Sequence, residues 1–426
     1  MTNLEPLESP QANNRDYSQP FRWSDRRILG FIPIILSVSI ALFLARSHGS
    51  QLIFEDERDY MAISRNVVGH AFYSIDGTTP TAFRQPGWPM AMSLVLLLGG
   101  GVKACRFFSV FIYGASLLVG KKVAEECFGS IGGSAFAWLS LLYPVLAYTA
   151  GTLFPQSLAT LLLVLGLLLS LRLNTSIPAN LLRGLVLGAL CLTVSTFVIP
   201  GILVVFYPVI MNGKKGWMPA LIAGLAMCIA LAPWLVRNAI VMGEPTMSTN
   251  LGINLALGNS SASGPNTGVN GLPAGFRPPV GLSEVQSDHW YRNAAVSWVE
   301  SNPSRAASLY VLKFLNYFGY KLDLRTSNNA GTGHASEAVL CVSYYSIVLL
   351  AILSFFRKSL TEATRLRIFL CVLYVTFGLA SAVFFTRVRF RTPMDLVLIL
   401  LASGAVVAVL GASNRKNGLD GTLPAP

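Results

Sequence analysis

Long apolar runs separated by short polar segments dominate the sequence. The clearest runs are 28–45, 105–120, 130–150, 217–234, 338–356, 368–385 and 394–411. A helix needs roughly 20 apolar residues to cross a bilayer core about 30 Å thick. Because lipid offers the backbone no hydrogen-bond partners, runs of this length must be helical. The pattern therefore predicts an all-α membrane protein, folded as a polytopic helical bundle.

Composition agrees with lipid as the solvent. Hydrophobic residues make up 53% of the 426 residues and charged residues only 12%, whereas a soluble domain carries about 25% charged residues. The net charge of +12 fits the excess of Lys and Arg in cytoplasmic loops of membrane proteins. No basic run with interleaved aromatic residues points to nucleic acid, so we expect membrane lipid as a partner and no nucleic acid.

The basic residues predict the orientation. Those that we place on the cytoplasmic side are Lys121, Lys122, Arg172, Arg183, Lys214, Lys215, Arg357, Lys358, Arg365, Arg367, Arg415 and Lys416. This placement requires an even number of crossings between neighbouring basic loops, and it puts both chain ends in the cytoplasm. We expect about 10–11 transmembrane helices.

Two apolar segments do not fit a simple crossing. The segment 88–101 has only 14 residues and is followed by Lys103 and Arg106. Runs of about 10–14 residues are more often interfacial than spanning, so we interpret it as a juxtamembrane element on the outer face, although the pattern leaves a crossing open. The segment 181–211 is too long for one helix. Its Pro200-Gly201 pair predicts two short helices that meet at the outer face.

Two long polar segments fall on the side opposite the basic loops, which we take to be the periplasm. The predicted organisation is a cytoplasmic tail (1–27), a transmembrane core with a periplasmic loop at 46–87 (28–236), a long periplasmic loop (237–337), C-terminal transmembrane helices (338–411) and a cytoplasmic tail (412–426). Loops of this length in a compact domain are usually functional.

The first periplasmic loop begins with a cluster of acids. Residues 54–60 read Phe-Glu-Asp-Glu-Arg-Asp-Tyr. Such a cluster is either a solvated turn or a set of carboxylates placed at the membrane surface to accept a proton or bind a metal. Composition alone leaves both interpretations open.

Three motifs carry a family resemblance. They are Asp-Glu-Arg-Asp-Tyr at 56–60, Arg-Gln-Pro-Gly-Trp-Pro at 84–89 and Pro-Trp-Leu-Val-Arg-Asn at 233–238. The chain thereby resembles integral-membrane glycosyltransferases that use a polyprenyl-phosphate sugar as donor. It is most similar to the bacterial aminoarabinose transferase and protein mannosyltransferase group, which has the GT-C fold. The resemblance covers roughly residues 25–400.

The resemblance implies a mechanism. Asp56 matches the catalytic carboxylate of the family, which would deprotonate or position the acceptor hydroxyl while the sugar is transferred with inversion. Glu57 would fix the geometry or help bind a divalent metal, and a metal site, if there is one, would use Asp56 and Glu57. The implied donor is a polyprenyl-phosphate sugar, and the acceptor is an envelope lipid, glycan or protein.

The resemblance and the charge pattern together give candidate substrate-binding residues. Cations should neutralise the lipid phosphate that leaves, and at outer-face positions the alternative is snorkelling to lipid headgroups. The candidates are Tyr60, Arg84, Arg106, Gln156, Arg237, Asn238, Asn254, Arg387, Arg389 and Arg391. Gln156 stands roughly where relatives often carry a second acid. An amide can bind a sugar but carries no charge, which argues against a two-carboxylate metal site.

We therefore expect an inner-membrane glycosyltransferase with its active site facing the periplasm. A transporter or flippase is one alternative, but it predicts ionisable residues buried mid-helix, and the long apolar runs contain few. A non-catalytic envelope-assembly protein is the other. The sequence does not specify the sugar, the acceptor, the metal dependence or the oligomeric state.

Overall fold

The apolar runs fold into helices throughout the part of the chain that the computed structural model describes, residues 30–172, 176–266, 272–321, 334–356 and 361–416. No strand occurs in these ranges, which confirms the predicted all-α fold. The predicted cytoplasmic tail 1–27 lies outside the described residues, as does most of the tail 412–426.

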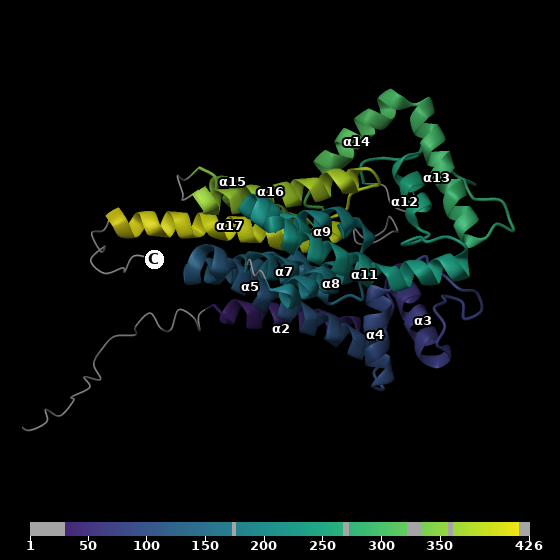
Figure 1. Ribbon diagram of the computed structural model, residues 1–426, viewed down its shortest axis with the longest axis horizontal. Helices are drawn as coiled ribbons and strands as arrows, with labels where there is room; N and C mark the ends of the chain where they lie inside the picture. The colour runs from purple at the N-terminus through teal and green to yellow at the C-terminus, as the bar shows by residue number, and fades with distance from the viewer. Residues whose placement is uncertain (1–29, 173–175, 267–271, 322–333, 357–360, 417–426) are drawn as a thin grey trace, which may run out of the picture.

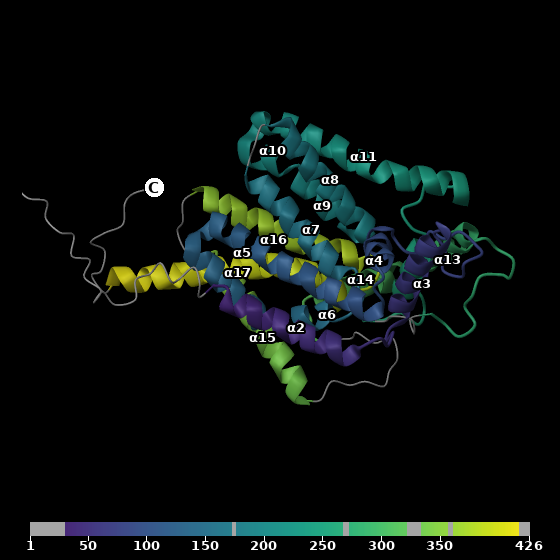
Figure 2. The same ribbon diagram turned by 90° about the horizontal axis from the view of Figure 1, so that it is seen from below.

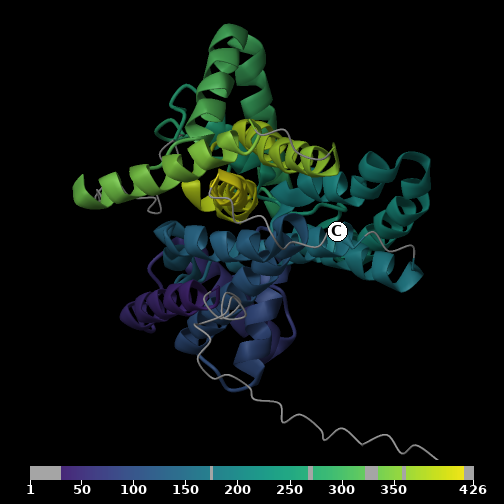
Figure 3. The ribbon, with the colours of Figure 1, turned by 90° about the vertical axis from the view of Figure 1, so that its left-hand side faces the viewer.

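One group of helices forms the bundle, and most of its members run along the long direction of the molecule (Figure 1). Its members are α2 (Ile32–His48), α5 (Val102–Leu141), α7 (Gln156–Leu171), α8 (Ile177–Thr193), α9 (Val198–Val205), α10 (Tyr207–Asn212), α11 (Trp217–Met242), α15 (His334–Leu353), α16 (Thr361–Ala382) and α17 (Val388–Lys416). In the view along the bundle, α17 is seen end-on among the other helices (Figure 3). Residues 391–405 of α17 are buried, so this helix forms the centre of the core.

A second group gathers near one end of the bundle. It contains α3 (Glu55–His70), α4 (Gly87–Leu97), α12 (Leu251–Gly258), α13 (Glu284–Ser301) and α14 (Pro303–Tyr317). The short α6 (Pro144–Ala150) and the 3-10 turns η2 (Ser195–Phe197) and η3 (Gly213–Gly216) complete the described helices. Helices α13 and α14 follow each other closely in the chain, and Pro303 begins the second one.

Helix α5 is a hairpin of two arms. Gly129 has a φ of 74°, a left-handed conformation that glycine adopts without steric cost. The ring of Phe136 lies directly against Gly120. In a straight helix these residues would lie about 24 Å apart, so the chain must reverse at Gly129. The two arms match the separate helices predicted at 105–120 and 130–150.

The chain break within 181–211 lies earlier than predicted. Helix α8 ends at Thr193, and Val194 is extended with φ −146° and ψ 108° before the η2 turn. Pro200 instead occupies the first turn of α9, where a helix requires no N–H donor. Proline was therefore a misleading signal for this break.

The bundle presents an apolar surface suited to lipid. Five helical stretches in the described residues are long and apolar enough to cross a membrane: Val102–Leu141, Ser195–Met242, Ser336–Leu353, Thr364–Ala382 and Val388–Leu410. Large side chains such as Phe43 and Phe111 are 70% and 72% exposed. A soluble protein would bury apolar patches of this kind. The number of crossings, 10–11, stays a prediction.

Helix α4 is too short to cross a bilayer. Its 11 residues span about 16 Å at 1.5 Å per residue. It lies across the direction of the bundle helices (Figure 1) and exposes Leu94 and Leu97. This geometry supports the juxtamembrane interpretation of 88–101.

The basic loops and the second helix group lie at opposite ends of the bundle. Arg172, just after the end of α7, binds Glu126 near the Gly129 turn at 2.9 Å. Lys214 and Lys215 lie in the turn before α11, whose other end leads to the second group. Figure 2 shows α8 and α11 side by side over this distance. The structure therefore separates these basic loops from the second helix group, as the charge pattern predicted, whereas Arg357 and Lys358 lie outside the described residues.

A buried ion pair anchors α17. Arg391 was expected in a loop, but the structure places it within α17, 1% exposed, with its Nε 2.8 Å from Asp395 Oδ1. Tyr143 donates a hydrogen bond to Asp395 at 2.8 Å, and Arg391 donates to the carbonyls of Tyr317 and Gly319. The pair thus joins α17 to the α5–α6 connection and to the end of α14.

Replacing Asp395 with alanine should destabilise the protein strongly. A buried arginine without its carboxylate typically costs about 3–5 kcal/mol, so the thermal unfolding midpoint in detergent should fall well below that of the wild type. Replacing both partners, as Arg391→Met with Asp395→Leu, removes the uncompensated charge and should recover much of the loss. A single variant no less stable than the double variant would contradict this account.

Candidate active site

A cavity of about 380 Å³ opens at the end of the bundle that carries the second helix group. Its walls come from seven parts of the chain. They are the first turns of α3, residues 83–85, residues 154–156 at the start of α7, residues 194–196, α12, Leu272 and residues 381–390, from the end of α16 to the start of α17. Segments from both halves of the chain therefore build one chamber.

The first turns of α3 divide the acid cluster into two groups. Acids suit the N-terminal end of a helix because its dipole is positive there. Residues three apart share a helix face, whereas neighbours point about 100° apart. Asp56 and Asp59 accordingly line the cavity, as does Glu55, and Glu57 is turned into the protein, fully buried.

Asp56 lies between two arginines. Its Oδ1 is 2.7 Å from Arg84 Nη2, and its Oδ2 is 2.7 Å from Arg389 Nη1. Arg84 also binds Asp59 at 2.7 Å. The cluster therefore links α3, the loop before α4 and the start of α17.

These charges control the pKa of both acids. Burial would raise the pKa of Asp56, but the positive charges of Arg389 and Arg84 outweigh burial and lower it to about 2. For Asp59, burial outweighs Arg84, and the pKa is raised. Because the pKa of Asp56 is lower in the folded state, its ion pairs stabilise the fold above about pH 4. This contribution is lost as the pH falls toward 2.

Aromatic rings hold the two arginines in place. The guanidinium of Arg389 lies 4.3 Å from the ring centroid of Phe154, and that of Arg84 lies 5.3 Å from that of Tyr60. Cation–π contacts orient a guanidinium while leaving its N–H groups available for hydrogen bonds in the ring plane. Arg387 also lines the cavity, 5.6 Å from the ring of Phe385.

A buried lysine supports the cavity wall. Lys313 of α14 is fully buried and donates hydrogen bonds to the carbonyls of Gly258 and Phe384 at 3.1 and 2.9 Å. Burial lowers its pKa to about 8. Phe384 lines the cavity just before the arginines of the α16–α17 connection. Lys313 thus fixes the segment that presents Arg389.

Glu57 and Arg106 form a separate buried unit. Both are fully buried, and their side chains pair through two contacts of 2.9 Å. Glu57 also accepts from the backbone N–H groups of Ile53 and Leu153 at 2.8 and 2.9 Å. All of its acceptor directions are used within the protein, so the pair joins α3 to α5 and to the chain before α7, outside the cavity lining.

The motif at 233–238 also lies outside the cavity lining. Arg237 donates to the carbonyl of Thr81 at 2.8 Å, and Asn238 donates to that of Thr246 at 2.7 Å. The guanidinium carbon of Arg237 lies 5.1 Å from the ring centroid of Trp234. These contacts hold the loop before α4 against α11, and Arg84 belongs to that loop.

The cavity therefore brings together part of the predicted set: Asp56, Tyr60, Arg84, Gln156, Asn254, Arg387 and Arg389. The remaining predicted residues, Glu57, Arg106, Arg237, Asn238 and Arg391, make internal contacts instead. Sequence reasoning missed Asp59, whose spacing of three from Asp56 was an available signal. It also missed Ser195, Asn250 and Ser381, for which the sequence gives no signal.

Similarity to known proteins is visible only in the fold. No family model matches the sequence, and no curated protein matches it. The apo oligosaccharyltransferase of Archaeoglobus fulgidus matches with a TM-score of 0.57 at 12% identity, covering 94% of this chain and 52% of that one. The same enzyme tethered with an acceptor peptide containing the NVT sequon gives a TM-score of 0.52 at 11% identity, over the same shares. The fold is of the GT-C type.

The GT-C match is partial. The chain spans about half the length of that oligosaccharyltransferase, 52%. ArnT from Cupriavidus metallidurans bound to undecaprenyl phosphate is a weaker match, with a TM-score of 0.44 at 14% identity, covering 92% of this chain and 81% of that one. At identities this low, the likeness establishes the fold alone.

The acids Asp56 and Asp59 of this GT-C chamber are paired with arginines. No three His, Cys, Asp or Glu residues in the described ranges lie close enough to hold one. Both oxygens of Asp56 already bind guanidinium groups, and Gln156 supplies an amide where a second acid was considered. The predicted pair of Asp56 and Glu57 is not brought together, because Glu57 binds Arg106.

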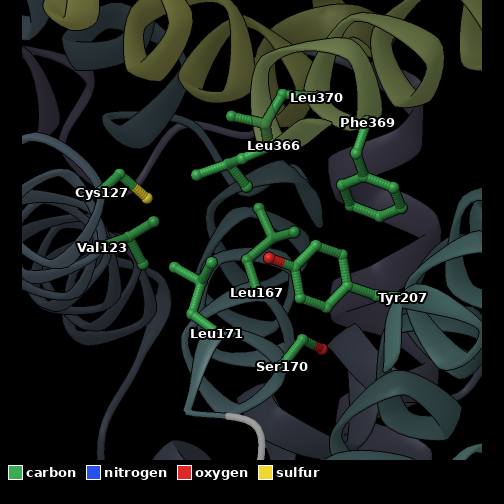
Figure 4. A pocket seen from close by; sticks show the side chains of 9 residues that line it. All are labelled: Val123, Cys127, Leu167, Ser170, Leu171, Tyr207, Leu366, Phe369 and Leu370. Atoms are coloured by element: carbon green, nitrogen blue, oxygen red, sulfur yellow. The ribbon is translucent and has the colours of Figure 1, made fainter. Parts of the chain in front are cut away.

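A second hollow plays no part in this site. Figure 4 shows it in the bundle, lined mainly by apolar side chains such as Leu167 and Phe369. Its volume is about 10 Å³, at most enough for one water molecule.

Removing Arg106 tests whether the Glu57–Arg106 pair is structural. Arg106→Met leaves a buried carboxylate unpaired, which should cost about 3–5 kcal/mol and lower the unfolding midpoint in detergent. Asp56→Asn should lower it far less, because Asp56 lies at a cavity that water can enter. If Arg106→Met unfolded like the wild type but lost activity, the pair would belong to the functional site.

Proposed function

We propose that the protein is a glycosyltransferase that moves a sugar from a polyprenyl-phosphate donor to an envelope lipid, glycan or protein, with inversion. The observation that carries the proposal is Asp56, held between Arg84 and Arg389 at a cavity at one end of a GT-C bundle. The motifs at 56–60 and 84–89, which resemble those of this enzyme class, supply two of these residues.

The arginines suit the donor phosphate. Guanidinium groups bind phosphate oxygens through paired, charge-assisted hydrogen bonds. Arg84, Arg387 and Arg389 line the cavity together. A donor phosphate would compete with Asp56 for the N–H groups of Arg84 and Arg389. As the phosphate takes these donors, Asp56 loses its cationic partners and its pKa rises from about 2, which makes it a better base.

The chemical step follows from this exchange. The acceptor hydroxyl oxygen attacks the anomeric carbon on the face opposite the phosphate, and its proton passes to Asp56. The bond between the anomeric carbon and the phosphate oxygen breaks, and its electron pair stays with the lipid phosphate. The arginines stabilise the charge that develops there. A single displacement of this kind inverts the anomeric configuration.

The charge distribution supports an inner-membrane location with the cavity in the periplasm. Lys121, Lys214 and Lys215 lie at the end of the bundle opposite the cavity, and such residues mark the cytoplasmic side. The polyprenyl tail would then remain in lipid beside the bundle. A transporter is less favoured. The buried Arg391 and Asp395 of α17 neutralise each other, and neither lines the cavity.

Replacing Asp56 with asparagine tests the catalytic role. A general base typically contributes 10²–10⁴-fold, so the variant should lose transfer by about this factor while staying folded. Mass spectrometry of envelope glycans, from cells that carry each variant in place of the wild type, measures the loss.

Asp76→Asn is the matched control, because Asp76 is an acid in the same loop region but outside the cavity lining. It should leave the glycans unchanged. A wild-type glycan pattern with Asp56→Asn would contradict the assignment and favour a non-catalytic protein.

A further inference from the structure

Two buried oxygens stand out along the cavity wall. Gln156 Oε1 and Ser381 Oγ are the side-chain oxygens in the described ranges that are buried without a hydrogen-bond partner, and both residues line the cavity. Gln156 is 5% exposed and Ser381 6%. An unsatisfied buried polar group destabilises the folded state, and native proteins keep few of them. Both oxygens therefore point to a polar ligand.

Other residues of the same types satisfy their hydrogen bonds within the protein. Gln85, which also lines the cavity, donates to Ser195 at 2.9 Å and to Ser248 at 3.1 Å. Helical serines such as Ser140 and Ser170 bond to the carbonyl four residues earlier, at 2.8 and 2.7 Å. Neither arrangement occurs for Gln156 or Ser381, so their free oxygens are particular to this wall.

The helix ends explain how these groups reach the cavity. Gln156 is the first residue of α7, directly after Pro155, and Ser381 is in the last turn of α16. Helix α7 begins at the cavity and α16 ends there, so both side chains are presented to the cavity directly from a helix. Each is neutral, in contrast to the Asp56 cluster on the α3 side. The cavity thus carries these two neutral hydrogen-bonding side chains in addition to its charged groups.

The hydrogen-bonding chemistry of these two neutral side chains indicates the kind of ligand they would bind. An amide oxygen only accepts hydrogen bonds, so it has no attraction for a phosphate oxygen, which also accepts. A sugar hydroxyl can donate to Gln156 Oε1 and can accept from or donate to Ser381 Oγ. We propose that Gln156 and Ser381 form the subsite that holds the hydroxyl groups of the donor's sugar ring. This inference rests on the proposed function and deepens it.

Equilibrium binding separates the sugar subsite from the phosphate subsite. The full-length protein in lipid nanodiscs is titrated with polyprenyl phosphate and with polyprenyl-phosphate glucose, mannose and galactose. The wild type should bind at least one sugar-bearing ligand more tightly than polyprenyl phosphate. Gln156→Leu should lower the affinity for that ligand about 3–10-fold, as expected for the loss of one hydrogen bond. The affinity for polyprenyl phosphate should not change. Ser381→Ala should act in the same direction.

Ser403→Ala is the matched control, because Ser403 is fully buried but donates to the carbonyl of Leu400 at 2.7 Å. It should change none of the affinities. Three results would overturn the inference. The wild type could bind the sugar-bearing ligands no more tightly than polyprenyl phosphate. The Gln156→Leu variant could keep the wild-type preference for the sugar-bearing ligand, or it could lose affinity for polyprenyl phosphate to the same extent. Arg389→Gln tests the proposed function separately, because it should lower the affinity for all four ligands. If none of the four bound the wild type, both proposals would fail.

Discussion

The ion pairs of Asp56 with Arg84 and Arg389 are the constraint on which the site depends. They join the first turn of α3 to a loop and to the start of the central helix α17, across most of the sequence. Charged groups this close to a membrane are stable only when paired or solvated. The pairing satisfies that requirement in the free protein. Under the proposed function, it also holds the same arginines in position to bind a phosphate.

The rest of the architecture holds this cluster in position. Lys313 fixes the segment before Arg389, Arg237 holds the loop that carries Arg84, and Glu57 with Arg106 fixes the start of α3. Lys313, Glu57 and Arg106 are fully buried and Arg237 is half-buried, and all four bind other parts of the protein. Charged residues thus divide into a supporting set that makes internal contacts and a cavity set that a ligand can reach.

The sequence predicted the helical class, the separation of the basic loops from the polar segments, and much of the cavity, because hydrophobic runs and short motifs are local signals. It could not separate Asp56 from Glu57, or Arg389 from Arg391, because helix phase and tertiary packing decide which neighbour faces the cavity. The break before α9 was misplaced because Pro200 fits a first helical turn. Which arginines meet Asp56 depends on contacts between distant segments.

Cross-linking between positions 56 and 389 tests the central claim most directly. Cysteines replace Asp56 and Arg389 in a chain whose six native cysteines are substituted, and a short bifunctional thiol reagent is applied to intact membranes. The account predicts an intramolecular cross-link, detected by mass spectrometry, that does not form when position 389 is exchanged for position 415 at the other end of α17. A folded protein that gives no 56–389 cross-link would contradict it.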